Sequence, residues 1–363
     1  MAYPASFRVT EKRVRKKGKK PTCPHNMAFP AMMSALKGVL GLPQRFGDID
    51  AHGRIWESNL DYFFQMGISC EGFGLFFDLP HAVLQTGLFD GEPLVDCFSA
   101  EGIRYRLAAD ETVLKKDIPL DREDLQEQVC RHLSRDLPLV LLYHGKFSGS
   151  LPPLYNNNQI LLALGYENNA VRAYPFRDGH TANQAFQMMK NSKLYPDWKD
   201  GLFGILFVDG LCEPADRREI SLKALQRGYE MMTASEANIT DYGFGDQLYR
   251  TWMQRIDDDD NYRYKKYAKR YIHPEEFDLA ERRCYTAEFL TEAQTYLGQG
   301  CLQPAAEAFR AIHDAMWEVH RLAFHDVDSS RFTRNKILNI IRQCKDLESQ
   351  ATENIDDVLK RFN

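Results

Sequence analysis

The sequence predicts an α+β protein, with an antiparallel sheet in the N-terminal domain and an all-α C-terminal domain. Three short apolar runs between residues 137 and 176 alternate with turn residues, which is typical of buried strands. Beyond residue 216, apolar side chains instead recur at helical spacing. The 363 residues suffice for two domains. We therefore expect a basic flexible arm over 1–22, an α/β domain over 23–215 and a helical domain over 216–363.

The composition argues against several classes of protein. A net charge of −5 gives no reason to expect nucleic-acid binding, and no apolar run approaches the roughly 18 residues of a membrane helix. The eight cysteines are scattered without a Cys-x-x-Cys pair, which argues against a zinc site or disulfide framework and predicts a cytoplasmic protein. Lysine and arginine supply seven of residues 12–20. We expect a solvated tail there, with an arm that reaches an acidic partner as the alternative.

The N-terminal domain begins with helical and mixed segments. Pro30 suits the first turn of a helix, so the run PAMMSALKGVL (30–40) is predicted to be helical. Residues 45–66 are amphipathic and aromatic, and MGISCEGFGLFF (66–77) combines a glycine-punctuated turn with a buried strand. A short α/β segment is predicted over 93–97 and 103–107, with Cys97 on a strand. Residues 122–134 are predicted to form a helix.

Three strands form the centre of the predicted sheet. They run over 139–143, 160–164 and 170–174, with a Gly-Tyr-Glu-Asn-Asn turn between the last two and a further strand at 203–208. In an antiparallel meander the end of the first strand, the start of the second and the end of the third lie at one edge. That edge should collect the polar residues Tyr143, His144, Asn157, Asn158, Gln159, Tyr174, Asp178 and His180.

The C-terminal domain is predicted to hold helices over 219–233, 243–257, 275–297, 303–324 and 329–361. Their apolar stripes fit an intramolecular core, and a homodimer through the last helices is the alternative. The acidic run 257–260 indicates a helix exit, because the glycine and ligand spacing of a calcium loop are missing. His313 and His320 lie two helical turns apart, too far for one ion, so no metal site is expected.

Several segments resemble one family. The strand core at 137–176, the turn at 66–77 and the segments 243–257, 278–290 and 304–322 are similar to the butirosin biosynthesis protein H-like N-terminal domain family. That family belongs to the papain-like, C39-like superfamily of cysteine enzymes, so the resemblance implies a papain-like N-terminal domain. It also implies acyl transfer from a carrier-protein thioester to an amine, in the biosynthesis of specialised metabolites.

The resemblance implies a catalytic triad that this sequence lacks. A papain-like site needs a cysteine at a helix N-terminus, a histidine base on a facing strand and an acid that orients the histidine. The matching positions are Ala31, Gln159 and, for the acid, the neighbourhood of Tyr174. None of them carries the expected residue. We assign these three positions, with Tyr143 and Asn158, to substrate binding.

A rearranged site is the remaining route to catalysis. His144 with Asp178 or His180 would form a displaced acid/base pair at the strand edge. Cys23, in a proline-flanked loop before the first helix, and Cys70, in a glycine-flanked turn, are the candidate nucleophiles. An inert loop thiol and a buried core thiol are the corresponding alternatives.

Two functions are compatible with these patterns. The first is an enzyme that forms or transfers an amide at the rearranged site. The second is a catalytically silent papain-fold relative that binds a small molecule, a peptide or a carrier protein in the old cleft. A third interpretation is a partner-binding protein that dimerises through its C-terminal helices.

No Walker loop, Rossmann fingerprint or Gly-x-Ser-x-Gly motif is present, so no cofactor is expected.

Overall fold

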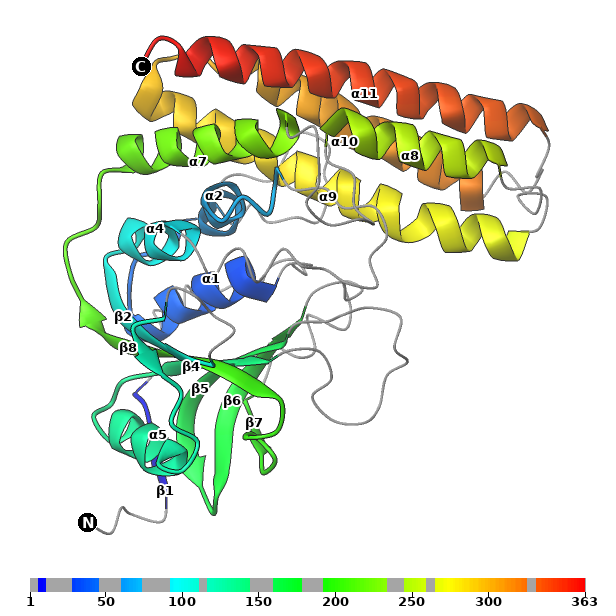
Figure 1. Cartoon of the computed structure of the whole chain (residues 1–363). Helices are drawn as coiled ribbons and strands as arrows, with labels where there is room; N and C mark the ends of the chain where they lie inside the picture. The colour runs from blue at the N-terminus through cyan, green and yellow to red at the C-terminus, as the bar shows by residue number, and fades with distance from the viewer. Residues whose placement is uncertain are drawn as a thin grey trace, which may run out of the picture. The chain divides into compact units, whose positions relative to one another are not determined.

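A computed structural model of the chain describes residues 6–10, 28–45, 60–73, 92–110, 116–143, 159–177, 192–233, 245–258, 265–324 and 331–362 (Figure 1). The chain divides into two compact units. Residues 1–65 and 80–215 form the first unit, and residues 66–79 and 216–363 form the second. The described part of the first unit is mixed α/β, whereas the described elements of the second unit are helical.

The described strands of the first unit form one sheet. Their order is β3-β2-β8-β4-β5-β6-β7, and β1 pairs with β5. All pairs are antiparallel except β2 with β3, so the predicted antiparallel sheet is confirmed apart from this short parallel edge pair. The strands are β1 (Ser6–Arg8), β2 (Ile103–Ala109), β3 (Ile118–Pro119), β4 (Leu139–Tyr143), β5 (Gln159–Glu167), β6 (Ala170–Arg177), β7 (Lys193–Tyr195) and β8 (Leu202–Leu211).

The three predicted central strands are confirmed as β4, β5 and β6. Every residue of β4 is buried, because β4 lies inside the sheet between β8 and β5. β5 and β6 form a hairpin whose two-residue loop is Asn168-Asn169. Both asparagines have positive φ angles (50° and 66°), as a type I′ hairpin turn requires. Asparagine tolerates this left-handed conformation better than most residues, which is why the predicted turn forms here.

Helices cover both faces of this sheet (Figure 1). They are α1 (Ala28–Leu40), which contacts β5 and β6, α4 (Glu92–Ala100), which contacts β2, and α5 (Leu125–Leu133), which contacts β4 and β5. Phe98 of α4 packs on Tyr105 of β2, whereas His132 of α5 packs edge-on against Phe207 of β8. Tyr105 pairs with the residue that follows Phe207, so these two rings point to opposite faces.

The prediction of a strand at 93–97, with Cys97 on it, is wrong. These residues belong to helix α4, in which Leu94, Cys97 and Phe98 are buried and Val95 is 51% exposed. Burial at positions i, i+3 and i+4 is the helical period. The apolar run is too short for its pattern to distinguish a strand from an amphipathic helix. In the structure the segment is a helix that packs against β2.

A buried ionic cluster lies within the first unit. The ammonium of Lys37, on α1, lies 2.8 Å from an oxygen of Asp61 and 2.6 Å from an oxygen of Glu101. Asp61 lies on α2 (Leu60–Ile68) and also accepts a 2.7 Å hydrogen bond from the Arg45 side chain. The Gln65 amide donates to Glu101 at 3.2 Å. Because Lys37, Asp61 and Glu101 are nearly inaccessible to water, each charge depends on its partners inside the cluster.

The second unit contains α7 (Arg217–Thr233), α8 (Gly245–Asp258), α9 (Lys265–Leu297), α10 (Gln303–Phe324) and α11 (Arg331–Leu359). All five lie where the sequence predicted helices, and α9 starts ten residues earlier than expected. The predicted apolar stripe of α10, which includes Phe309, Ile312 and Met316, is fully buried. None of the helices in the described part of the chain combines the length and apolarity needed to cross a membrane.

Candidate functional site

Half of the residues that the sequence nominated for a site fall outside the described residues. These are Cys23, His144, Asn158, Asp178 and His180. Their roles stay predictions. The other five, Ala31, Cys70, Tyr143, Gln159 and Tyr174, lie on described elements.

The predicted strand edge exists, but only part of the predicted cluster lies on it. Tyr143 pairs with Gln159, and Gln159 pairs with Arg177, so the ends of β4, β5 and β6 align as expected. Tyr174 instead pairs with Leu162, three positions into the sheet and on its other face. The sequence placed Tyr174 at the edge because it ended the third strand too early; β6 continues to Arg177.

Ala31 and Tyr143 are both buried. Ala31 lies in the first turn of α1 and is 3% exposed. Tyr143 is 1% exposed, and its hydroxyl donates a 2.6 Å hydrogen bond to the backbone carbonyl of Trp198. Burial is the main reason why the pKa of Tyr143 lies well above its ordinary value. A neutral, hydrogen-bonded phenol of this kind anchors the loop that contains Trp198.

Cys70 lies in a turn that arginines of the second unit hold by its backbone. The turn follows α2, Cys70 has a positive φ of 63°, and its side chain is 4% exposed. Arg282 donates to the carbonyl of Glu71 at 2.5 Å, and Arg283 donates to the carbonyl of Gly72 at 2.6 Å. A thiol needs access to its substrate to act as a nucleophile, and this one is covered in a clamped turn.

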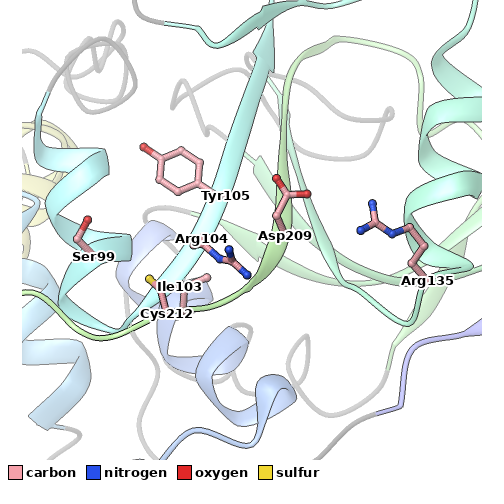
Figure 2. Close-up of a pocket in the computed structure, with 7 residues that line it drawn as sticks. All are labelled: Ser99, Ile103, Arg104, Tyr105, Arg135, Asp209 and Cys212. Carbon is pink, nitrogen blue, oxygen red and sulfur yellow. The ribbon is translucent and has the colours of Figure 1, made fainter.

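An open cavity in the first unit, which the sequence did not predict, collects polar side chains (Figure 2). Its volume is about 610 Å³, within the range of small-molecule sites. We call it the arginine pocket. It is lined by Ser99, Ile103, Arg104, Tyr105, Arg135, Asp209 and Cys212. These residues come from the end of α4, the start of β2, the turn after α5 and the end of β8.

A β-bulge shapes the arginine pocket. Arg104 pairs with Gly210 and Tyr105 pairs with Val208, which leaves Asp209 without a partner in the ladder between β2 and β8. Gly210 has a φ of +128°, a conformation that residues with a side chain rarely adopt. A Cβ atom at Gly210 would lie 3.5 Å from Nη2 of Arg104, an ordinary van der Waals contact, so the backbone conformation and not the space favours glycine here.

The charges in the pocket are not balanced. Asp209 accepts hydrogen bonds of 2.5 and 3.1 Å from Arg106, the next charged residue along β2. The hydrogen bond from Arg106 is the main cause that lowers the pKa of Asp209, with smaller contributions from the charges of Arg106, His132 and Arg135. Asp209 is thus an anion whose charge Arg106 already neutralises.

Arg104 and Arg135 supply the uncompensated charge. Both are exposed, and neither guanidinium makes a hydrogen bond or an ion pair with another residue in the part of the chain that the structure describes. In the view of Figure 2, the Asp209 carboxylate lies between them. The pocket region thus holds three guanidinium groups, those of Arg104, Arg106 and Arg135, against the single carboxylate of Asp209. This surplus of positive charge favours an anion, because arginine presents a planar fork that matches carboxylates and phosphates.

Cys212 and Ser99 add a thiol and a hydroxyl to the lining of the pocket. Cys212 is an exposed free thiol at the rim, and its N–H donates to the carbonyl of Gly102. Ser99 contributes a hydroxyl. Burial is the main cause that lowers the pKa of the nearby His132; the Pro138 carbonyl and the charge of Asp209 oppose this shift, and the charges of Arg135 and Arg106 add to it.

Metal binding finds no support among the described residues. No group of three or more His, Cys, Asp or Glu side chains lies close enough there to hold an ion. His313 and His320 both pack edge-on against Trp317, and Nδ1 of His313 lies 2.8 Å from the carbonyl of Ala280. Stacking and a backbone hydrogen bond account for these histidines.

The arginine pocket left only weak signals in the sequence. Arg104 and Arg106 alternate with Tyr105 in an otherwise apolar strand, and Asp209-Gly210 interrupts the apolar run of β8. A glycine inside a strand pattern is a sign of a bulge. Nothing in the sequence joins these two strands to Arg135.

No family model matches the sequence, and no curated protein is significantly similar to it.

Proposed function

We propose that this chain binds a small anionic molecule in the arginine pocket and is a catalytically silent relative of papain-like acyl-handling enzymes. The observation that carries the proposal is the pair Arg104 and Arg135, two exposed guanidinium groups that line one cavity and make no hydrogen bond or ion pair with a carboxylate among the described residues. Arginine–anion hydrogen bonds are charge-assisted and directional, so this pair favours a ligand with a carboxylate or phosphate group.

The described residues support binding more than turnover. Acyl transfer needs an accessible thiolate beside a base. Ala31 offers no nucleophile where the papain-like pattern places one, and Cys70 is buried in its turn. The competing function is transfer of an acyl group from a carrier-protein thioester to an amine, with Cys23 or Cys70 as nucleophile and His144 as base.

A titration tests the anion site. Inorganic phosphate and succinate are titrated calorimetrically into the full-length protein and into Arg104→Gln and Arg135→Gln. Each variant should weaken binding by about tenfold or more, because a charge-assisted hydrogen bond contributes about 1.5–3 kcal/mol. Arg122→Gln is the matched control, since Arg122 is exposed and already paired with Asp110. Unsaturable binding of both anions, or equal affinities in all four proteins, would refute the proposal.

A second experiment separates the silent binder from the enzyme. The protein is incubated with an acyl thioester of N-acetylcysteamine and an amine, and amide formation is followed by mass spectrometry. We expect no turnover, and we expect iodoacetamide to label Cys70 only after unfolding. Amide formation that disappears in His144→Ala would establish the enzymatic function instead.

Dimerisation through the C-terminal helices stays a prediction. In the described part of the chain, the large hydrophobic side chains that are exposed are Val95, Leu194, Leu211 and Tyr296. None of these lies on α10 or α11, so the described side chains of these two helices offer no support for a dimer. Light scattering coupled to size-exclusion chromatography measures the mass directly.

A further inference from the structure

We infer that the ligand of the arginine pocket is an amphipathic anion: an apolar chain that ends in a carboxylate or phosphate. The inference rests on the proposed function and specifies its ligand. A carboxylate or phosphate group alone fills only a small part of a cavity of about 610 Å³. The remaining space needs a further part of the ligand, and the residues around the pocket indicate that this part is apolar.

Two of the exposed hydrophobic side chains belong to residues that neighbour the lining of the arginine pocket without being part of it. Leu211 is 44% exposed, precedes the lining residue Cys212 and pairs with the lining residue Ile103. Val95 is 51% exposed and lies on α4, four residues before the lining residue Ser99. Residues four apart share a helix face, so Val95 lies on the face of α4 that carries Ser99. Each of these two elements thus carries an exposed apolar side chain near a residue that lines the pocket.

The interior of the pocket has the same mixed character. Ile103 is buried, and the ring of Tyr105 lies against Phe98 with a centroid distance of 4.3 Å. Burial is also the main cause that raises the pKa of Tyr105, so its hydroxyl is neutral and adds no charge to the site. The lining of the pocket therefore includes Ile103 and Tyr105 together with two guanidinium groups, a combination that matches an apolar chain with one anionic end.

A chain-length series tests this inference. Acetate, butyrate, hexanoate and octanoate, with octyl phosphate in parallel, are titrated into the full-length protein below their micellar concentrations. The affinity should rise by up to about fourfold for each added methylene that the pocket covers. The tighter of octanoate and octyl phosphate identifies the anionic end, and a rise with chain length supports the inference in either case.

Variants show which side chains carry the effect. In the double variant Val95→Ser/Leu211→Ser the dependence on chain length should flatten, while the affinity for acetate is unchanged. Leu194→Ser is the matched control, because Leu194 is 41% exposed but lies on β7, away from the pocket residues. All of these positions are on the surface, and circular dichroism checks that each variant folds.

The two proposals fail in different ways. If acetate and inorganic phosphate bind as tightly as octanoate and octyl phosphate, the inference is overturned and the anion site stands. A control variant that flattens the series as much as the double variant also overturns the inference. If none of the anions binds, or if octanoate binds Arg104→Gln as tightly as the wild type, the proposed function fails and the inference falls with it.

Discussion

Replacement of Glu348 by glutamine is expected to destabilise the second unit by about 3–5 kcal/mol. Glu348, on α11, accepts hydrogen bonds of 2.9 and 2.5 Å from Arg283 of α9 and one of 2.7 Å from the hydroxyl of Tyr249 on α8. The side chain of Arg283 is 0% exposed and that of Glu348 is 6% exposed. Arg283 also lies over the ring of Phe309, 5.3 Å from its centroid. This pair and its contacts therefore link four helices of the bundle, α8, α9, α10 and α11.

The magnitude follows from what the substitution leaves behind. Glutamine keeps the size of the side chain but removes the negative charge, so the buried guanidinium of Arg283 loses its counter-ion. A buried charge that loses its partner costs about 3–5 kcal/mol. Tyr249→Phe removes only one hydrogen bond to the carboxylate, which costs about 1.5–3 kcal/mol. In the double variant the two costs should not add, because both substitutions act on the same oxygen atoms.

Equilibrium unfolding in guanidinium chloride, followed by the helical circular dichroism signal, measures these free energies. Glu318→Gln is the matched control. Glu318 contacts Arg321 and Lys336 at the surface, where its side chain is 36% exposed, and such pairs contribute at most about 1 kcal/mol. If Glu348→Gln costs no more than Glu318→Gln, the Arg283–Glu348 pair is not a buried structural link and the reasoning is wrong.

Three further predictions concern other parts of the fold. His132 is buried with a lowered pKa. As pH falls below about 6.5, the unfolded chain therefore takes up a proton that the folded one does not, and stability falls by at most about 1.4 kcal/mol per pH unit. His132→Gln should remove this loss in urea unfolding at pH 7.5 and 5.5, and an unchanged slope contradicts it. Lys37→Met removes the buried cation that Asp61 and Glu101 share, although Asp61 keeps its contact with Arg45, and should cost about 3–5 kcal/mol in chemical denaturation. The exposed Lys223→Met serves as its control, and equal costs would contradict the prediction. In Gly228→Ala the new Cβ would lie 2.7 Å from the ring of Phe73, and the resulting overpacking should cost about 1–3 kcal/mol. Because Ala is otherwise the better helix former by about 1 kcal/mol, a raised melting temperature would show that the ring yields freely.

Local sequence patterns predicted the secondary structure well where a helical period repeats over many turns, or where the residues of a turn favour positive φ angles. The five C-terminal helices repeat apolar residues over many turns, and α10 begins and ends where Pro304 and the following break indicated. Asn168 and Asn169 indicated the hairpin, because asparagine tolerates the positive φ angles that its turn needs. The prediction for a short segment was wrong because the segment holds too few residues to show a period. Cys97 lies in a run of five residues, too few to separate a helical period from an alternating one.

The candidate site shows the limit of reasoning from sequence more clearly. The strand edge with Tyr143 and Gln159 was predictable, because antiparallel register follows from strand order. The arginine pocket was not, because Arg104, Arg135 and Asp209 are far apart in the chain and no motif joins them.

The sequence by itself determined the elements, since helical period, strand runs and turn residues act over a few neighbours. The sequence also shows Ala31 and Gln159 at the two positions where the resemblance to papain-like enzymes implies a nucleophile and a base. Only the tertiary structure decided which charges find partners. The β-bulge between β2 and β8 leaves Asp209 as an extra residue in the ladder, and its carboxylate accepts a hydrogen bond from Arg106. Arg104 and Arg135 were left facing the same cavity. Ion pairs depend on distances of a few ångströms between remote segments, so the sequence does not encode them as a local pattern.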